Sequence, residues 1–198
     1  MSYLKFVKNI FTVGFLDLLG IIQGLVFLSL ITKILGAQDY GIWSQLRVTM
    51  SLAIAFTFLG LHEALIRFIP GEKDKEKAKE GVYSSLALVF FINLIIALFL
   101  MIFSGYVSMF LKFDQIFVKL LSLIIIFESL NTIFLVVIRA IREIGKYFWF
   151  VTSKMLLEIG LVVIIILQGY GLLEVVVSYL AIKILLFLAL LFVLFFLL

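Results

Sequence analysis

Phe117 to Ile138 reads FVKLLSLIIIFESLNTIFLVVI, an apolar run that contains Glu128 and Asn131 near its centre. A helix rises about 1.5 Å per residue, so about 20 mostly apolar residues cross the hydrocarbon core of a bilayer. The apolar residues are continuous instead of alternating with polar ones, which excludes a strand of a membrane β-barrel. This stretch therefore predicts a transmembrane helix that carries polar groups at membrane depth.

The composition extends this prediction to the whole chain. Of its 198 residues, 65% are hydrophobic and 14% are charged, whereas soluble domains have about 45–50% apolar and about 25% charged residues. The apolar excess has to face lipid, so we predict an all-α, polytopic transmembrane helix bundle in which residues 1–198 form one domain. The six predicted spans are Ile10 to Ile31, Trp43 to Phe68, Val82 to Phe103, Phe117 to Ile138, Phe148 to Leu167 and Val175 to Leu198.

The distribution of basic residues predicts the orientation. Basic residues between spans collect on the cytoplasmic side of a membrane. On the side of the N-terminus lie Lys5, Lys8, Arg67, Lys73, Lys75, Lys77, Lys79, Arg139, Arg142 and Lys146. On the opposite side lie Lys33, Arg47, Lys112 and Lys119. We therefore expect a multi-pass protein of the cell membrane whose N-terminus is cytoplasmic.

Two cytoplasmic connections have distinctive compositions. Gly71 to Gly81 reads GEKDKEKAKEG, which is a solvated charged loop or a short helix with opposite charges three and four residues apart. Arg139 to Phe150 is first basic and then aromatic. We expect this second segment to lie along the membrane interface, beside anionic headgroups.

Ionisable residues inside the spans are the candidate functional residues. Each costs at least about 2.5–3.5 kcal/mol at membrane depth, so such groups usually face a bundle interior or an aqueous cavity. One interpretation is structural: Lys154 and Glu158, one helical turn apart, form an internal pair, and the other charges complete further pairs. The other interpretation is a hydrated cavity for transport. In that case Arg47, Lys154 and Lys183 contact an anionic substrate, and Asp17, Glu128 and Glu158 carry a coupling proton or cation.

The sequence lacks the motifs of soluble enzymes and metal sites. It has no Cys and one His, and His62 begins HEALI without the second histidine of a zinc-protease helix. Neither a P-loop nor a GxGxxG turn is present. We therefore predict no enzymatic activity, no cofactor and no metal. Because most of the basic residues lie between spans, we also predict no nucleic-acid partner.

Two motifs border the second span. Leu35 to Gln45 reads LGAQDYGIWSQ, and Leu59 to Pro70 reads LGLHEALIRFIP. In order and spacing they resemble the N-terminal region of the polysaccharide repeat-unit flippases, the O-antigen and capsule exporters of the multidrug/oligosaccharidyl-lipid/polysaccharide superfamily. The matching residues, whose expected role is to set turns and helix ends, are Gly36, Tyr40, Gly41, Leu59, Gly60, Arg67 and Pro70.

The resemblance implies a fold, a substrate and partners. Members of that family have two six-helix lobes with a cavity between them, and this chain resembles the N-terminal lobe. They move an oligosaccharide joined by pyrophosphate to a polyprenol across the membrane by alternating access. Ile184 to Leu198 is apolar to its last residue, so we expect either a longer chain or a second six-helix lobe, which is a homologous half or a copy of this chain.

Other functions stay open at this point. A drug or cation antiporter lobe of the same superfamily would share the architecture, and a cavity dominated by carboxylates would favour it. A non-transporting lobe, truncated or acting as a scaffold for glycan assembly, would also share it. A membrane glycosyltransferase is disfavoured, because no long polar loop is present to house an active site.

Overall fold

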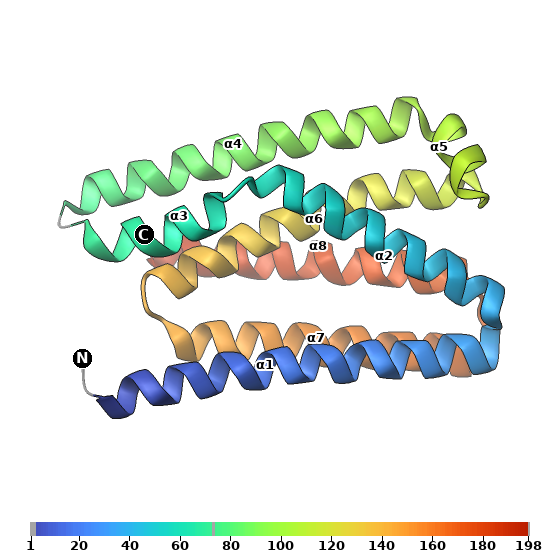
Figure 1. Ribbon diagram of the computed structural model, residues 1–198, viewed down its shortest axis with the longest axis horizontal. Coiled ribbons are helices and arrows are strands. Elements are labelled where there is room, and N and C mark those ends of the chain that lie inside the picture. Colours follow the sequence, from blue (N-terminus) through green and yellow to red (C-terminus); the bar gives the residue numbers. More distant parts are fainter. Residues whose placement is uncertain (1–2, 73, 198) are drawn as a thin grey trace.

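The computed structural model describes residues 3–72 and 74–197, and these form helices without any strand (Figure 1). Lys73 and Leu198, and the side chains of Lys5, Lys8 and Lys75, lie outside the described parts. In chain order the elements are α1 (Tyr3–Leu30), the π-helical turn η1 (Ile31–Leu35), α2 (Ala37–Phe58), α3 (Leu61–Phe68), the 3-10 turn η2 (Ile69–Gly71), α4 (Lys75–Ile102), α5 (Ser104–Leu111), α6 (Gln115–Ala140), α7 (Ile144–Leu167) and α8 (Leu172–Leu197).

The predicted all-helical class is confirmed. Within the described residues, five helices are long and apolar enough to cross a membrane: α1 with η1, α4, α6, α7 and α8. A sixth candidate arises if the bent pair of α2 and α3 counts as one span. The long helices run back and forth, and the connections α3–α4 and α6–α7 lie at the same end of the bundle (Figure 1).

Helix α6 lies at the centre of the bundle. It packs against α4 on one side and α8 on the other, and it also contacts α2, α3 and α7. Helix α1 packs mainly along α7, and these two form a layer beside the remaining helices (Figure 1). The polar residues of α6 are therefore placed where they can meet polar residues of several other helices.

The segment predicted as the second span, Trp43 to Phe68, consists of two helices joined by a bend. Leu59 and Gly60 adopt left-handed backbone conformations, with φ of 40° and 85°, and they separate α2 from α3 with a bend of 52°. Two successive left-handed residues end the helical hydrogen-bond ladder, and the side chains on both sides are apolar enough to hide this break from a hydropathy reading. Gly36, between η1 and α2, also has a positive φ of 105°.

The structure shows how the chain folds in the two connections that the sequence singles out. Asp74 caps α4 by accepting a hydrogen bond from the Glu76 N–H at 3.0 Å, so most of the charged segment 71–81 forms the first turns of α4. The segment from Arg139 to Phe150, which is expected at the membrane interface, contains the tight turn between α6, which ends at Ala140, and α7, which begins at Ile144. These capping and turn hydrogen bonds satisfy backbone groups that would otherwise be unpaired at the helix ends.

Candidate functional site

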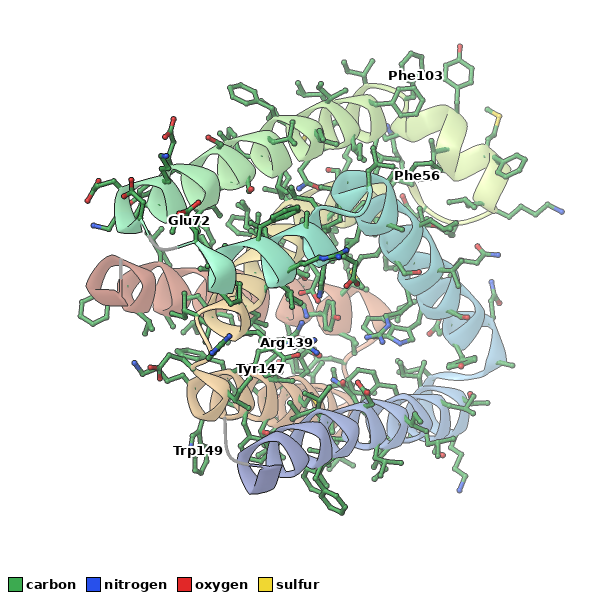
Figure 2. The ribbon with its side chains drawn as sticks, turned by 60° about the vertical axis from the view of Figure 1, so that its left-hand side comes forward. Phe56, Glu72, Phe103, Arg139, Tyr147 and Trp149 are labelled. Atoms are coloured by element: carbon green, nitrogen blue, oxygen red, sulfur yellow. The ribbon has the colours of Figure 1, made fainter. Side chains whose placement is uncertain are left out.

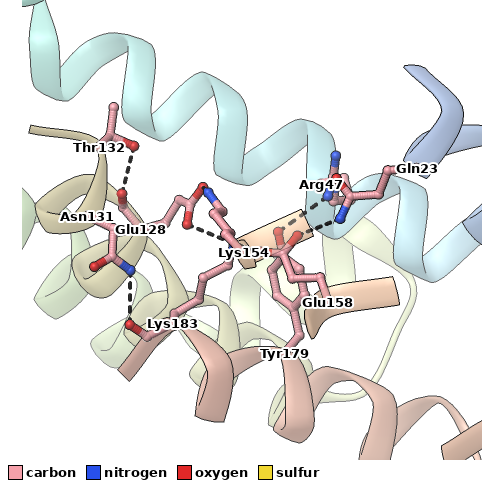
Figure 3. Close-up of polar contacts among 9 residues, drawn as sticks. All are labelled: Gln23, Arg47, Glu128, Asn131, Thr132, Lys154, Glu158, Tyr179 and Lys183. Carbon is pink, nitrogen blue, oxygen red and sulfur yellow. Dashed lines mark hydrogen bonds and ion pairs between the residues drawn. The ribbon is translucent and has the colours of Figure 1, made fainter. Parts of the chain in front are cut away.

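Four charged side chains meet near the middle of α6, α7 and α8 (Figure 3). Lys154 Nζ lies 2.6 Å from Glu128 Oε1, and Lys183 Nζ lies 2.8 Å from Glu128 Oε2. Lys183 Nζ also donates a hydrogen bond to Glu158 Oε1. Lys183 therefore joins two carboxylates from two different helices, and Glu128 joins two lysines. We call these four residues the charged cluster.

The members of the charged cluster differ in exposure. The side chains of Lys183 and Glu158 are 0% and 2% exposed, whereas those of Glu128 and Lys154 are 11% and 17% exposed. A buried charge is tolerated only when close partners and hydrogen bonds replace its hydration. Lys183 has two carboxylate partners and meets this condition fully. Lys154 lies at the edge of the charged cluster. It has one carboxylate partner, and its side chain is partly exposed.

Helices α1 and α2 add polar groups to the charged cluster. Gln23 Nε2 donates a hydrogen bond to Glu158 Oε2 at 2.6 Å, which occupies the second oxygen of that carboxylate. Arg47 Nη1 donates to the Tyr179 hydroxyl at 3.3 Å, and the ammonium of Lys183 lies 4.2 Å from the centre of the Tyr179 ring. A cation over an aromatic face is attracted by the ring quadrupole. Five helices thus converge on one polar centre.

A second contact ties α6 to α8 at the same level. Asn131 Nδ2 donates a hydrogen bond to the backbone carbonyl of Lys183 at 2.9 Å, and both residues are buried (Figure 3). Interhelical hydrogen bonds of this kind are how polar side chains hold helices together where water is excluded. The same two helices are therefore joined by an amide hydrogen bond and by the ion pair between Lys183 and Glu128.

The structure brings together five of the six ionisable candidates. Glu128, Glu158, Lys154 and Lys183 form the charged cluster, and Arg47 reaches it through Tyr179. Asp17 lies apart, exposed on α1. The expected pairing of Lys154 with Glu158 was wrong, because Lys154 bonds to Glu128 across the α6–α7 contact while Lys183 and Gln23 occupy Glu158.

Sequence reasoning did not identify Tyr179 as part of the site. It stands four residues before Lys183 and is 3% exposed. The usable signal was this spacing, since residues four apart lie on one face of a helix. Trp43 of α2 packs edge-on against the Tyr179 ring, with centroids 5.3 Å apart, and this contact fixes the orientation of the phenol.

The chemistry available to this site is charge recognition. Three cations face two carboxylates, so the centre has an excess of positive charge. A cavity beside Arg47 and Tyr179 has about 10 Å³ of space, which is room for about one water molecule. Within the described residues, no three His, Asp or Glu side chains converge as ligands of a metal ion would. The site as it stands is a packed polar centre whose accessible groups lie at its edges.

Comparison with known proteins found no match to a family model, a curated protein or a solved structure. The functional interpretation therefore rests on the residues and on their geometry. The resemblance of Leu35–Gln45 and Leu59–Pro70 to the flippases stays a likeness of sequence pattern.

Proposed function

We propose that this chain is the N-terminal lobe of a membrane transporter that flips lipid-linked oligosaccharides from the cytoplasmic to the outer leaflet. The observation that supports it most is the charged cluster halfway along helices of membrane-spanning length. Ionisable groups at that depth are expensive and usually mark substrate or ion pathways. The six-span topology with a cytoplasmic N-terminus is part of this proposal and follows from the basic connections.

The sign of the charge favours an anionic substrate. Arg47, Lys154 and Lys183 exceed the carboxylates Glu128 and Glu158 by one charge. A pyrophosphate group joining sugar to polyprenol is a strong acceptor for both Lys and Arg. This excess argues against the alternative of a cation antiporter lobe, whose substrate would be repelled by the same centre.

Within the charged cluster, the ion pair of Lys154 and Glu128 is the one best suited to open, so that Lys154 can bind a substrate phosphate in place of Glu128. Both side chains are partly exposed, whereas Lys183 and Glu158 are enclosed. Two ammonium groups favour the ionised form of Glu128, so in this scheme a phosphate first draws Lys154 away, and Glu128 then takes up a proton. Loss of that proton restores the ion pair and releases the phosphate. In this scheme Glu128 couples transport to a proton gradient, and Lys154 contacts the substrate.

Asp17 supports a second lobe or an aqueous path beside α1. It lies inside the apolar span of that helix, is exposed, and has no ion pair within the described residues. A carboxylate facing hydrocarbon alone is costly, so water or a protein partner is expected to cover it. In the proposed assembly, a second six-helix lobe, homologous or a copy of this chain, faces α1 across the substrate cleft.

The tight packing around Lys183 favours one further candidate, a lobe that does not transport. The cavity beside Arg47 holds about 10 Å³, far less than an oligosaccharide needs. In such a lobe the charged cluster, together with Gln23 and Arg47, would serve only to hold five helices together. This candidate predicts that the cluster affects stability and has no effect on lipid movement.

A flipping assay separates these candidates. The chain is purified from its own membranes, so that a bound partner lobe is retained, and is placed in vesicles with a polyprenyl-pyrophosphate-linked oligosaccharide. External glycosidase then measures how fast the sugar crosses the bilayer. We expect Lys154→Gln to slow flipping at least tenfold and its exposed control Lys146→Gln to leave it unchanged. A rate equal to that of protein-free vesicles for the unaltered protein would reject the flippase and favour the non-transporting lobe.

A further inference from the structure

A second charged region lies at the end of the bundle where α3 ends and α6 turns into α7. There a pocket of about 470 Å³ is lined by Arg67, Arg139 and Arg142, together with Pro70, Gly71 and Ile144. We call it the arginine pocket. A neighbouring hollow between α3 and α4 shares Arg67 and Gly71 and extends to Glu72 and Lys77. Figure 2 marks Glu72 near this end, and Arg139 beside Tyr147.

The arginines of this pocket lack anionic partners among the described residues. None of the three takes part in an ion pair there, and the only carboxylate beside Arg142 in sequence, Glu143, pairs with Lys146 at 3.6 Å. The Arg139 guanidinium lies 5.9 Å from the centre of the Tyr147 ring, which orients it without neutralising it. Three guanidinium groups around one hollow thus keep their hydrogen-bond donors available.

The backbone at Arg142 strengthens this interpretation. Its φ is 66°, and it occupies the position after the α6 C-cap where glycine is usual. The turn is closed by hydrogen bonds from the Arg142 N–H to the Arg139 carbonyl at 3.0 Å and from the Glu143 N–H to the Ile138 carbonyl at 3.1 Å. Glycine would adopt this conformation without steric cost. The chain instead carries arginine, which adds a cation to the pocket.

Aromatic residues next to the arginine pocket indicate its level in the membrane. Trp149 is 69% exposed on the first turns of α7, and Phe68 at the end of α3 is also exposed. Tryptophan is enriched where helices pass from hydrocarbon to headgroups. The pocket therefore lies at the depth of lipid phosphates, on the side that the basic connections predict to be cytoplasmic.

We propose that the arginine pocket binds a phosphate group, carried by an anionic lipid headgroup at this surface or by a soluble phosphate. Guanidinium groups bind phosphate oxygens through paired N–H donors, and three of them around one hollow suit such a ligand. This inference is independent of flipping, because a lobe that does not transport would bind the same headgroup. The binding site is separate from the charged cluster and needs no movement of the helices.

Binding by the purified full-length chain in detergent tests the proposal. The probes are phosphatidylglycerol, phosphatidylcholine as the lipid without net charge, and inorganic pyrophosphate, and bound ligand is counted by native mass spectrometry. The variant Arg142→Gly removes one guanidinium and relieves the left-handed backbone. The matched control is Lys112→Gly, which removes a cation from another left-handed position, φ 58°, at the opposite end of the bundle.

We expect Arg142→Gly to weaken phosphatidylglycerol binding about fivefold, the effect of one cation beside an anionic lipid, and Lys112→Gly to leave it unchanged. If Arg142→Gly weakens the binding of phosphatidylglycerol alone, the pocket binds lipid. If it weakens the binding of pyrophosphate alone, the pocket binds soluble phosphate. If it weakens the binding of both, the pocket recognises the phosphate group itself. Equal losses in the variant and the control, or no loss in the variant, overturn the proposal.

A second pair of variants tests the same proposal if Arg142→Gly does not fold. Arg67→Gln changes an exposed side chain of the same pocket, and Lys119→Gln changes an exposed lysine at the opposite end. We expect about the same fivefold loss of binding for Arg67→Gln and none for its control. Unchanged binding in Arg67→Gln would likewise overturn the proposal.

Discussion

The charged cluster and the arginine pocket both gather cations, lysines in the cluster and arginines in the pocket, but they place them in opposite situations. In the cluster, Lys154 and Lys183 each contact a carboxylate, and Lys183 contacts two. In the pocket, Arg67, Arg139 and Arg142 form no ion pair within the described residues. Where water is excluded, charges have to neutralise one another and so become part of the scaffold. Where water and headgroups are present, cations need no internal partner and stay available to ligands.

The largest effect is expected from Lys183→Met, which removes the cation shared by Glu128 and Glu158. Loss of one partner from a buried ion pair typically costs about 3–5 kcal/mol, because the remaining charge is left without compensation. We expect a loss of this size in the free energy of unfolding, measured by denaturant titration in mixed micelles. The exposed control Lys119→Met should change it little. A loss below about 1 kcal/mol for Lys183→Met would mean that water enters the cluster.

Lys154→Met should cost less than Lys183→Met. Glu128 keeps Lys183 as a partner after this change, and the site of Lys154 is partly exposed. A hydrogen bond to a charged group contributes about 1.5–3 kcal/mol to stability, and partial solvation should bring the loss to the lower end of that range. The same denaturant titration measures it, with Lys146→Met as control. Equal losses of unfolding free energy for Lys154→Met and Lys183→Met would contradict the distinction between the enclosed Lys183 and the partly exposed Lys154.

Arg142→Gly should change stability in the opposite direction. A residue other than glycine in the left-handed region costs about 1–2 kcal/mol, while a cation at a helix C-terminus gains about 0.3–1 kcal/mol. The difference predicts a small net stabilisation, of about 0.5–1 kcal/mol, which a rise in the unfolding midpoint would reveal. Destabilisation by this variant would indicate that the guanidinium supports the α6–α7 turn.

The smallest effect is expected from Glu143→Gln, which breaks the ion pair with Lys146 on the first turn of α7. Its atoms are 3.6 Å apart and both side chains are about half exposed, at 47% and 46%. Exposed pairs of this kind contribute about 0–1 kcal/mol. We expect an unfolding free energy within about 0.5 kcal/mol of the unaltered protein. A larger loss would show that this pair lies in a less hydrated place than its exposure indicates.

Apolar runs were sufficient to predict the helical class and the presence of several helices long enough to cross a membrane. They were insufficient at Leu59 and Gly60, because hydropathy continues through the break and only the backbone reveals it. They also missed the capped start of α4 at Asp74, because a run of alternating charges is compatible with either a loop or a helix.

For the candidate site, the sequence indicated how far along each helix an ionisable residue lies, but it did not indicate toward which neighbouring helix its side chain points. Glu128, Glu158 and Lys183 stand near the middle of their helices, and this position marked them as costly to bury in a membrane. The ion-pair partner of each residue depends on how α6 and α8 are rotated relative to α7. This rotation cannot be inferred from the sequence of one helix alone. For this reason Lys154 bonds to Glu128 and not to the nearer residue in sequence, and Asp17, at comparable depth, faces outward.

The hydrogen bond from Asn131 to the Lys183 carbonyl has a consequence for motion. Sliding α8 along α6 by one turn would break this bond and both contacts of Lys183 with its carboxylates at once. Helices α6 and α8 therefore behave as one rigid body. Helix α1 contacts the same centre through the side-chain amide of Gln23 and packs mainly along α7. Any bending within this bundle is expected between the rigid pair and α1, where fewer contacts would have to break.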